Sequence, residues 1–91
     1  MQDKILKIQN KSKSLMWGCT RHSETETMFC VGHKSYPREV RFIVVTDKLA
    51  VETVSDDHKI VLVKSCKSET EVLKVICELL KQWFPAKGVE S

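Results

Sequence analysis

Two cysteines and two histidines recur in the first third of the chain at a spacing that could bind a metal ion. Cys19 and His22 are three residues apart, and Cys30 and His33 repeat that spacing. Two thiolates and two imidazoles form a common tetrahedral ligand set for structural zinc. On an extended strand, however, residues three apart point to opposite faces. Because both pairs lie in strand-like segments, we expect Cys19 and Cys30 to be buried cross-strand neighbours, with a zinc module as the alternative.

Other residues that could be catalytic have simpler structural explanations. Cys66 precedes a predicted helix by two residues, but nothing marks a polar cleft around it, and Cys77 lies on the apolar stripe of that helix. The adjacent pair Asp56 and Asp57 is typical of a turn. The chain has no phosphate-binding glycine loop, nucleophile elbow, metal-binding helix motif or calcium loop. We therefore expect a protein without catalytic activity and without a cofactor.

The basic residues suggest a different kind of function. Residues 1–48 contain nine Lys and Arg against five Asp and Glu, whereas residues 49–91 contain six against seven. Basic residues interleaved with aromatic ones can contact phosphates and stack on bases. An alternative function is therefore binding of nucleic acid or anionic lipid by Lys4, Lys7, Lys11, Lys13, Arg38 and Arg41. The excess falls well short of the dense basic patch typical of nucleic-acid-binding proteins.

The overall composition is that of one small globular domain. The 91 residues are 42% hydrophobic and 30% charged, which is unlike a disordered chain. Because no apolar run is longer than four residues, the sequence indicates neither a transmembrane helix nor a signal-peptide core. We therefore expect an intracellular protein, in the cytoplasm or nucleus, whose four cysteines are reduced.

The clearest element is a C-terminal helix over residues 68–84. Ser68 and Glu71 have the spacing of a capping box, and Pro85 disfavours further helix. Apolar residues follow at helical spacing and cover an arc of about 200°. These are Val72, Leu73, Val75, Ile76, Cys77, Leu79, Leu80, Trp83 and Phe84. One sheet needs a narrower stripe than this, so the helix has an apolar excess.

The middle of the chain is predicted to form strands. Residues 15–22 and 27–33 resemble a hairpin, and residues 40–46 and 49–55 flank a two-residue turn before a strand over 59–65. These turns would place Val44 opposite Val51, and Val51 opposite Leu62. One face would then carry Phe42, Val44, Val51, Ile60 and Leu62. The other would carry Ile43, Val45, Ala50, Val54, Val61 and Val63, so both faces are apolar.

Together these elements predict an α+β domain spanning residues 1–91. Its parts are a basic segment (1–13, helix or strand), a five- or six-stranded antiparallel meander (14–66), the helix (68–84) and a polar tail (85–91). A strongly curved meander followed by one helix is similar to the last part of pleckstrin-homology-like domains, here over Val40–Phe84. That family normally has seven strands, and this chain offers at most six.

The apolar excess favours a role in binding proteins. One helix covers one side of a sheet, so the second side must be covered by the curling sheet itself, by the N-terminal segment or by a partner chain. We expect an adaptor, an assembly subunit or an inhibitor that binds a protein partner or a second copy of itself. The expected surface combines the far edge of the helix with one sheet face: Ile43, Val45, Val61, Val75, Leu79 and Trp83.

Overall fold

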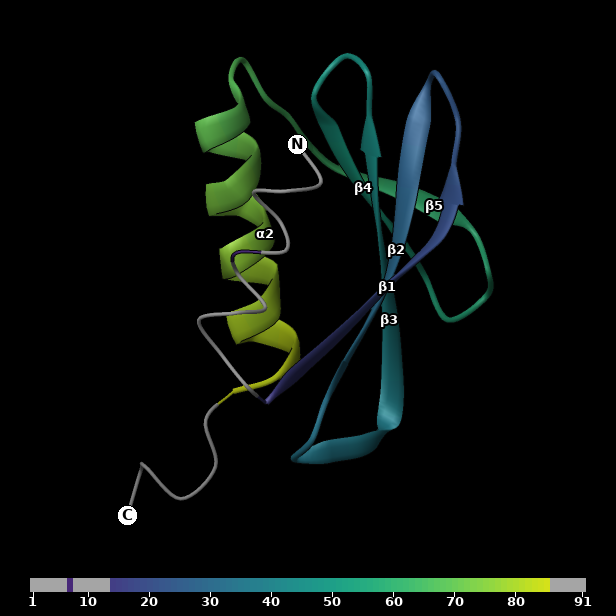
Figure 1. Ribbon diagram of the computed structural model, residues 1–91, viewed down its shortest axis with the longest axis vertical. Coiled ribbons are helices and arrows are strands. Elements are labelled where there is room, and N and C mark those ends of the chain that lie inside the picture. The colour runs from purple at the N-terminus through teal and green to yellow at the C-terminus, as the bar shows by residue number, and fades with distance from the viewer. Residues whose placement is uncertain (1–6, 8–13, 86–91) are drawn as a thin grey trace.

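The fold is an antiparallel sheet with one helix packed along it (Figure 1). The computed structural model describes residue 7 and residues 14–85. Within them the elements are β1 (Leu15–His22), β2 (Glu26–His33), β3 (Tyr36–Thr46), β4 (Ala50–Val54), β5 (Ile60–Ser65) and α2 (Glu69–Trp83). The five strands lie in the order β1-β2-β3-β4-β5, so β1 and β5 are the two edges. This confirms the predicted α+β meander with a C-terminal helix.

The sheet is open, which limits the resemblance to pleckstrin-homology-like domains. Each strand pairs only with its sequence neighbours, and five strands are present in residues 14–85 instead of seven. The resemblance extends to a meander followed by a helix and no further. Of the basic segment, Lys7 alone is described, and it is helical and exposed. The predicted polar tail lies outside the described residues apart from Pro85.

Helix α2 begins and ends where the sequence predicts. The Ser68 side chain accepts a hydrogen bond from the Glu71 backbone N–H at 3.2 Å. The Glu71 carboxylate in turn accepts from the backbone N–H of Lys67 at 3.1 Å, one residue before the cap. At the other end, the Phe84 N–H donates to the Leu80 carbonyl at 2.9 Å, and Pro85 follows. Both ends therefore have their exposed backbone groups partly satisfied.

The predicted pairing of β3, β4 and β5 is wrong by one residue at each turn. Val51 lies opposite Val45 instead of Val44, and Thr53 lies opposite Val61. The β3–β4 loop contains three residues, 47–49, and ends on Leu49, whereas the β4–β5 loop spans residues 55–59 and contains His58; both Leu49 and His58 have a positive φ of 62°. A three-residue loop of this kind shifts the register relative to a two-residue turn.

The two shifts exchange the faces of the sheet on which the side chains of β4 lie. Because side chains alternate along a strand, one residue of slip exchanges its faces. The second shift compensates for the first, so β3 and β5 keep their predicted relation to each other. The side chains of Ile43, Val45, Val51 and Thr53 therefore share one face, and those of Phe42, Val44, Ile60 and Leu62 share the other.

The hydrophobic core lies between α2 and the face that carries Ile43. From the sheet side it contains Leu15, Phe29, Val31, Ile43, Val45 and Val51, with Cys66 following β5. From the helix side it contains Val72, Val75, Ile76, Leu79, Leu80 and Phe84. Most of these side chains are less than a tenth exposed, and Ile43 and Ile76 are fully buried. The core therefore positions the sheet with its other face turned away from the helix.

Candidate interaction surface

The side of the sheet opposite α2 is apolar, and no described element covers it. In Figure 1 the helix runs along one side of the strands, and the other side faces outward. We call this side the open face. Strand alternation and the observed register assign to it Met16, Met28, Cys30, Val40, Phe42, Val44, Val54, Ile60 and Leu62. The open face thus contains apolar residues from all five strands.

Several of these side chains are unusually exposed for their type. Met16, Val40, Ile60 and Leu62 are each about half exposed, between 49% and 56%. Val44, at the centre of the sheet, is fully buried, although it lies on the side away from the core. Its neighbours on adjacent strands are Met28 and Glu52. The open face is therefore a partly packed apolar layer whose outer residues remain in water, a feature typical of interaction sites.

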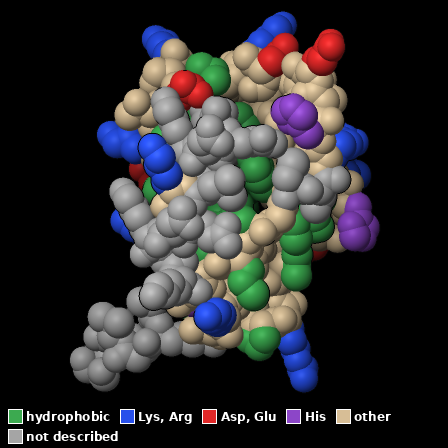
Figure 2. All heavy atoms as spheres, in the orientation of Figure 1, with side chains coloured by type: hydrophobic (Ala, Val, Ile, Leu, Met, Phe, Trp, Pro, Cys, Tyr) green, Lys and Arg blue, Asp and Glu red, His purple; other side chains and the backbone are tan. Residues whose placement is uncertain are grey.

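In one view of the molecule, many of the charged side chains lie near its outline (Figure 2). In Figure 2 lysine and arginine side chains project from the outline, whereas hydrophobic side chains form patches nearer the middle and lower part of the view. On the open face itself, the register adds two charged residues on the central row, Arg21 and Glu52. Arg21 forms an ion pair with Glu26. The open face is therefore apolar apart from these two charged residues within its central row.

The structure corrects the placement of the predicted interaction residues. Ile43 and Val45 lie on the face that α2 covers, and Val75 and Leu79 pack against them in the core. Val61 is on the same side but remains 48% exposed, because it belongs to the edge strand. The predicted sheet surface was therefore the wrong one of two apolar faces.

The helix has less apolar excess than its sequence indicates. Six of its nine apolar residues are buried, and Leu73, Cys77 and Trp83 are half-buried. Leu73 and Trp83 pack against the rim of the core. The exposed edge of α2 is consequently the one that carries Leu73 and Cys77, not the predicted edge with Val75 and Leu79.

Trp83 lies close to one of the predicted basic residues, Arg41. The guanidinium of Arg41 lies over the Trp83 ring at 5.9 Å from its centroid, within reach of a cation–π contact, and 4.0 Å from the Asp56 carboxylate. Arg38 and Lys7 are exposed. Lys4, Lys11 and Lys13 lie outside the described residues. Among the predicted basic residues, Arg41 thus already has partners within the chain.

The four predicted zinc ligands are not brought together. His22 ends β1 beside Thr27, whereas His33 ends β2, so the two histidines lie at opposite ends of this hairpin. The backbone of Cys19 pairs with Phe29, and that of Cys30 with Gly18, so the predicted cross-strand pairing of the two cysteines is also wrong. Within residue 7 and residues 14–85, no group of three potential metal ligands is close enough to hold an ion.

The cysteine nearest a helix start is poorly suited to nucleophilic chemistry. Cys66 is buried, and its backbone N–H donates to the Leu49 carbonyl at 3.0 Å. Burial raises the pKa of its thiol, and the nearby Glu71 carboxylate raises it further. A thiol with a raised pKa holds its proton at neutral pH, whereas a reactive cysteine needs the thiolate. Cys66 therefore contributes to the core.

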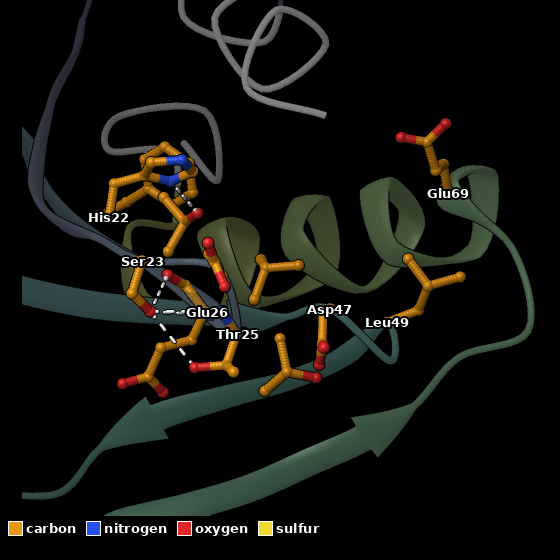
Figure 3. A pocket seen from close by; sticks show the side chains of 12 residues that line it. His22, Ser23, Thr25, Glu26, Asp47, Leu49 and Glu69 are labelled. Carbon is orange, nitrogen blue, oxygen red and sulfur yellow. Dashed lines mark hydrogen bonds between the residues drawn. The ribbon is translucent and has the colours of Figure 1, made fainter.

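An open pocket of about 260 Å³ lies between the β1–β2 and β3–β4 turns, near the start of α2 (Figure 3). Its polar groups mainly form the turns. The Ser23 hydroxyl accepts from the N–H groups of Thr25 and Glu26, and His22 is hydrogen-bonded to the Thr27 hydroxyl at 2.8 Å. The Asp47 N–H donates to the Thr25 carbonyl at 2.8 Å and ties the two turns together. The pocket thus follows from turn geometry, and its histidine and serine are not paired.

Comparison with known proteins finds no match: no family model, curated protein or solved structure is similar to this chain. Among the described residues, no helix has the length and apolar character needed to cross a membrane.

Proposed function

We propose that this protein is a non-catalytic, intracellular protein–protein interaction domain that binds its partner through the open face of the sheet. The observation that supports this most directly is the row of half-exposed apolar side chains on the side of the sheet away from α2. Covering such side chains gains roughly 25 cal/mol for each Å² of apolar surface removed from water. An adaptor, an assembly subunit and an inhibitor would all use such a surface.

The proposal also agrees with the chemistry of the described residues. Cys30, Cys66 and Cys77 are free thiols, as expected in a reducing compartment. The pocket between the β1–β2 and β3–β4 turns is lined largely by turn residues, and its serine hydroxyl accepts a backbone N–H within a turn. Binding of nucleic acid or anionic lipid receives less support, because Arg41 is directed to Trp83 and Asp56. The zinc alternative lacks a shared site for its four ligands.

A charge placed on the open face tests the proposal. Val40→Glu adds a carboxylate to an exposed open-face position, and Gln82→Glu adds the same charge to an exposed position on α2. Each tagged variant is expressed in the cells that make the protein, and bound proteins are quantified by mass spectrometry. We expect at least one specific protein to bind the parent chain and Gln82→Glu but not Val40→Glu.

Two controls make this experiment decisive. Circular dichroism and thermal unfolding establish that Val40→Glu keeps the fold, which we expect because Val40 is 56% exposed. If all three proteins capture the same partners in equal amounts, the open face is not the binding surface.

A further inference from the structure

We infer that two copies of this chain pair through β5, the exposed edge strand, to form one continuous ten-stranded sheet around a two-fold axis. This goes beyond the proposed function, because it concerns the edge of the sheet and needs no other protein on the open face. The occupant is a second copy of the same strand.

The first observation is that β5 is an exposed, largely apolar edge strand of the described sheet. All six of its residues are exposed, and four consecutive ones are apolar: Ile60, Val61, Leu62 and Val63. Edge strands in monomeric proteins are normally shielded by charges, prolines or irregularities. Each edge has one irregularity: the β1–β2 pairing shifts between Cys19 and Arg21, and the β4–β5 pairing shifts between Val51 and Glu52. Because β5 combines full exposure with four consecutive apolar residues, its outer edge is the side where another strand can add.

The second observation is the direction of the backbone groups along β5. The Ser55 N–H donates to the Lys59 carbonyl at 2.8 Å, so Lys59 turns its backbone groups toward β4. Because these directions alternate in an antiparallel pair, the backbone N–H and C=O groups of Val61 also point toward β4. Those of Ile60 and Leu62 point outward, away from β4. The pairing shifts between Val51 and Glu52, where Val63 is the extra residue on β5. The regular outward edge therefore consists of Ile60 and Leu62.

These two residues are arranged symmetrically about Val61. If Val61 lies on a two-fold axis, Ile60 of each copy falls opposite Leu62 of the other, and their outward N–H and C=O groups form four intermolecular hydrogen bonds. On the open face, Ile60 and Leu62 of both copies then meet side by side. A register centred on Leu62 would instead use the irregular part of the strand beyond it.

Charge complementarity favours the same arrangement. In antiparallel pairing, the turn before β5 in one copy lies beside the end of β5 in the other. This brings the acidic turn with Asp56 and Asp57 next to Lys64 of the second copy. Lys59 already has Asp57 at 3.8 Å, and Lys64 has Glu71 at 3.1 Å. In the proposed dimer, Lys59 and Lys64 therefore each have a carboxylate nearby, so lysines of the two copies do not face each other uncompensated.

Removal of one outward N–H group tests the pairing. Ile60→Pro deletes a donor that points away from β4, at the first residue of an edge strand, where proline is tolerated. Ile60→Ala shortens the side chain but keeps that donor, and it is the matched control. Sedimentation equilibrium of the full chain, from about 1 µM to about 1 mM, measures the dimer dissociation constant. We expect Ile60→Pro to raise it about tenfold above that of Ile60→Ala, since each copy loses one hydrogen bond.

A cross-link tests the register and remains informative if Ile60→Pro fails to fold. Residues opposite each other in a non-hydrogen-bonded pair have Cα atoms about 4.5 Å apart, which is within the range of a disulfide. Val61→Cys should therefore form a disulfide between its two copies under mild oxidation. Lys59→Cys should not, because each copy of this position lies opposite Val63. Peptide mass mapping distinguishes these links from those made by the native cysteines.

Three results would overturn the inference. The first is a chain that stays monomeric at about 1 mM. The second is a dimer whose dissociation constant is unchanged by Ile60→Pro but raised by Val40→Glu, which would place the contact on the open face. The third is a Val61→Cys variant that forms no link between its two copies while the dimer persists.

Discussion

Leu49 and His58 determine which residues of this protein face water, although neither is a glycine. Each has φ of 62° and lies in a loop between two neighbouring strands. A residue with a Cβ atom costs about 1–2 kcal/mol in this left-handed conformation. The Leu49 side chain packs against the core, which offsets part of that cost. His58 is exposed and has no such contact with the core.

We therefore expect His58→Gly to stabilise the fold. Glycine adopts positive φ without steric conflict, but it also makes the unfolded chain more flexible, so the net gain should be about 0.5 kcal/mol. Urea denaturation followed by circular dichroism measures the difference. His58→Ala retains a Cβ atom and should bring no gain. Equal stabilisation by both variants would show that the histidine side chain, and not its backbone conformation, is responsible.

Glu71 should give the fold a specific sensitivity to acid. Its pKa lies below the ordinary value of 4.5, first because the carboxylate accepts a hydrogen bond from the Lys67 N–H and then because Lys64 is near. The pKa of Lys64 is raised in turn, mainly by its hydrogen bond to Glu71. A carboxyl group with a lowered pKa in the folded state stabilises the fold above its ordinary pKa, and this contribution disappears as the pH falls through the lowered value.

The corresponding prediction concerns Glu71→Gln. The stability difference between parent and variant should be constant from about pH 6 to about pH 8, because Glu71 is ionised and Lys64 is charged throughout this range. Below pH 4.5 the difference should shrink as Glu71 takes up a proton. Urea unfolding at a series of pH values measures it. A difference that stays constant down to about pH 2 would mean that the charge of Glu71 does not contribute.

At the scale of elements, α2 depends on its first turn. Ser68→Ala removes the side-chain oxygen that accepts from the Glu71 N–H, and it should cost about 1 kcal/mol of folding free energy. Ser68→Asp keeps an acceptor at the same position and should remain close to the parent protein. Chemical denaturation of the three proteins gives the comparison. If both substitutions are equally destabilising, the hydroxyl acts through some contact other than the cap.

The elements of this fold could be predicted from the sequence, whereas the register between the strands could not. Helix α2 was predictable because its cap, its apolar period and Pro85 all indicate the same limits. The strands were predictable from their runs of β-branched residues. Their register was not, because Leu49 and His58 give no local sign of a left-handed conformation, and the usual glycine or asparagine is missing from both loops.

The predicted surface was wrong for a related reason. Ile43 and Val45 alternate along β3 with Phe42 and Val44, and both pairs are equally apolar. Sequence pattern alone does not tell which pair the helix covers when both faces have the same composition. The choice depends on packing with Leu15, Phe29 and Val31 from distant strands. The zinc hypothesis was limited in the same way, since three-residue spacing does not bring ligands together in paired strands.

For the whole molecule, the central feature is the difference between its two sheet faces. Val31 is fully buried under α2, whereas Val40 on the open face is 56% exposed. We expect Val31→Ala to cost about 2 kcal/mol and Val40→Ala to stay within about 0.5 kcal/mol of the parent. Because the chemical change is identical, thermal or urea unfolding compares the two faces directly. Similar losses would mean that the open face is packed in the folded protein.

The neighbour-only order of the strands has a consequence for how the chain folds. Each hairpin joins segments that are close in sequence, so the sheet has a low contact order and its pairings can form quickly. Helix α2, the last described element, shares one hydrophobic core with residues of β1, β2, β3 and β4. Until α2 docks, both faces of the sheet are exposed to water, and the edge strand β5 is exposed as well. The tendency to aggregate during synthesis or refolding therefore depends on the time that passes before α2 packs on the sheet.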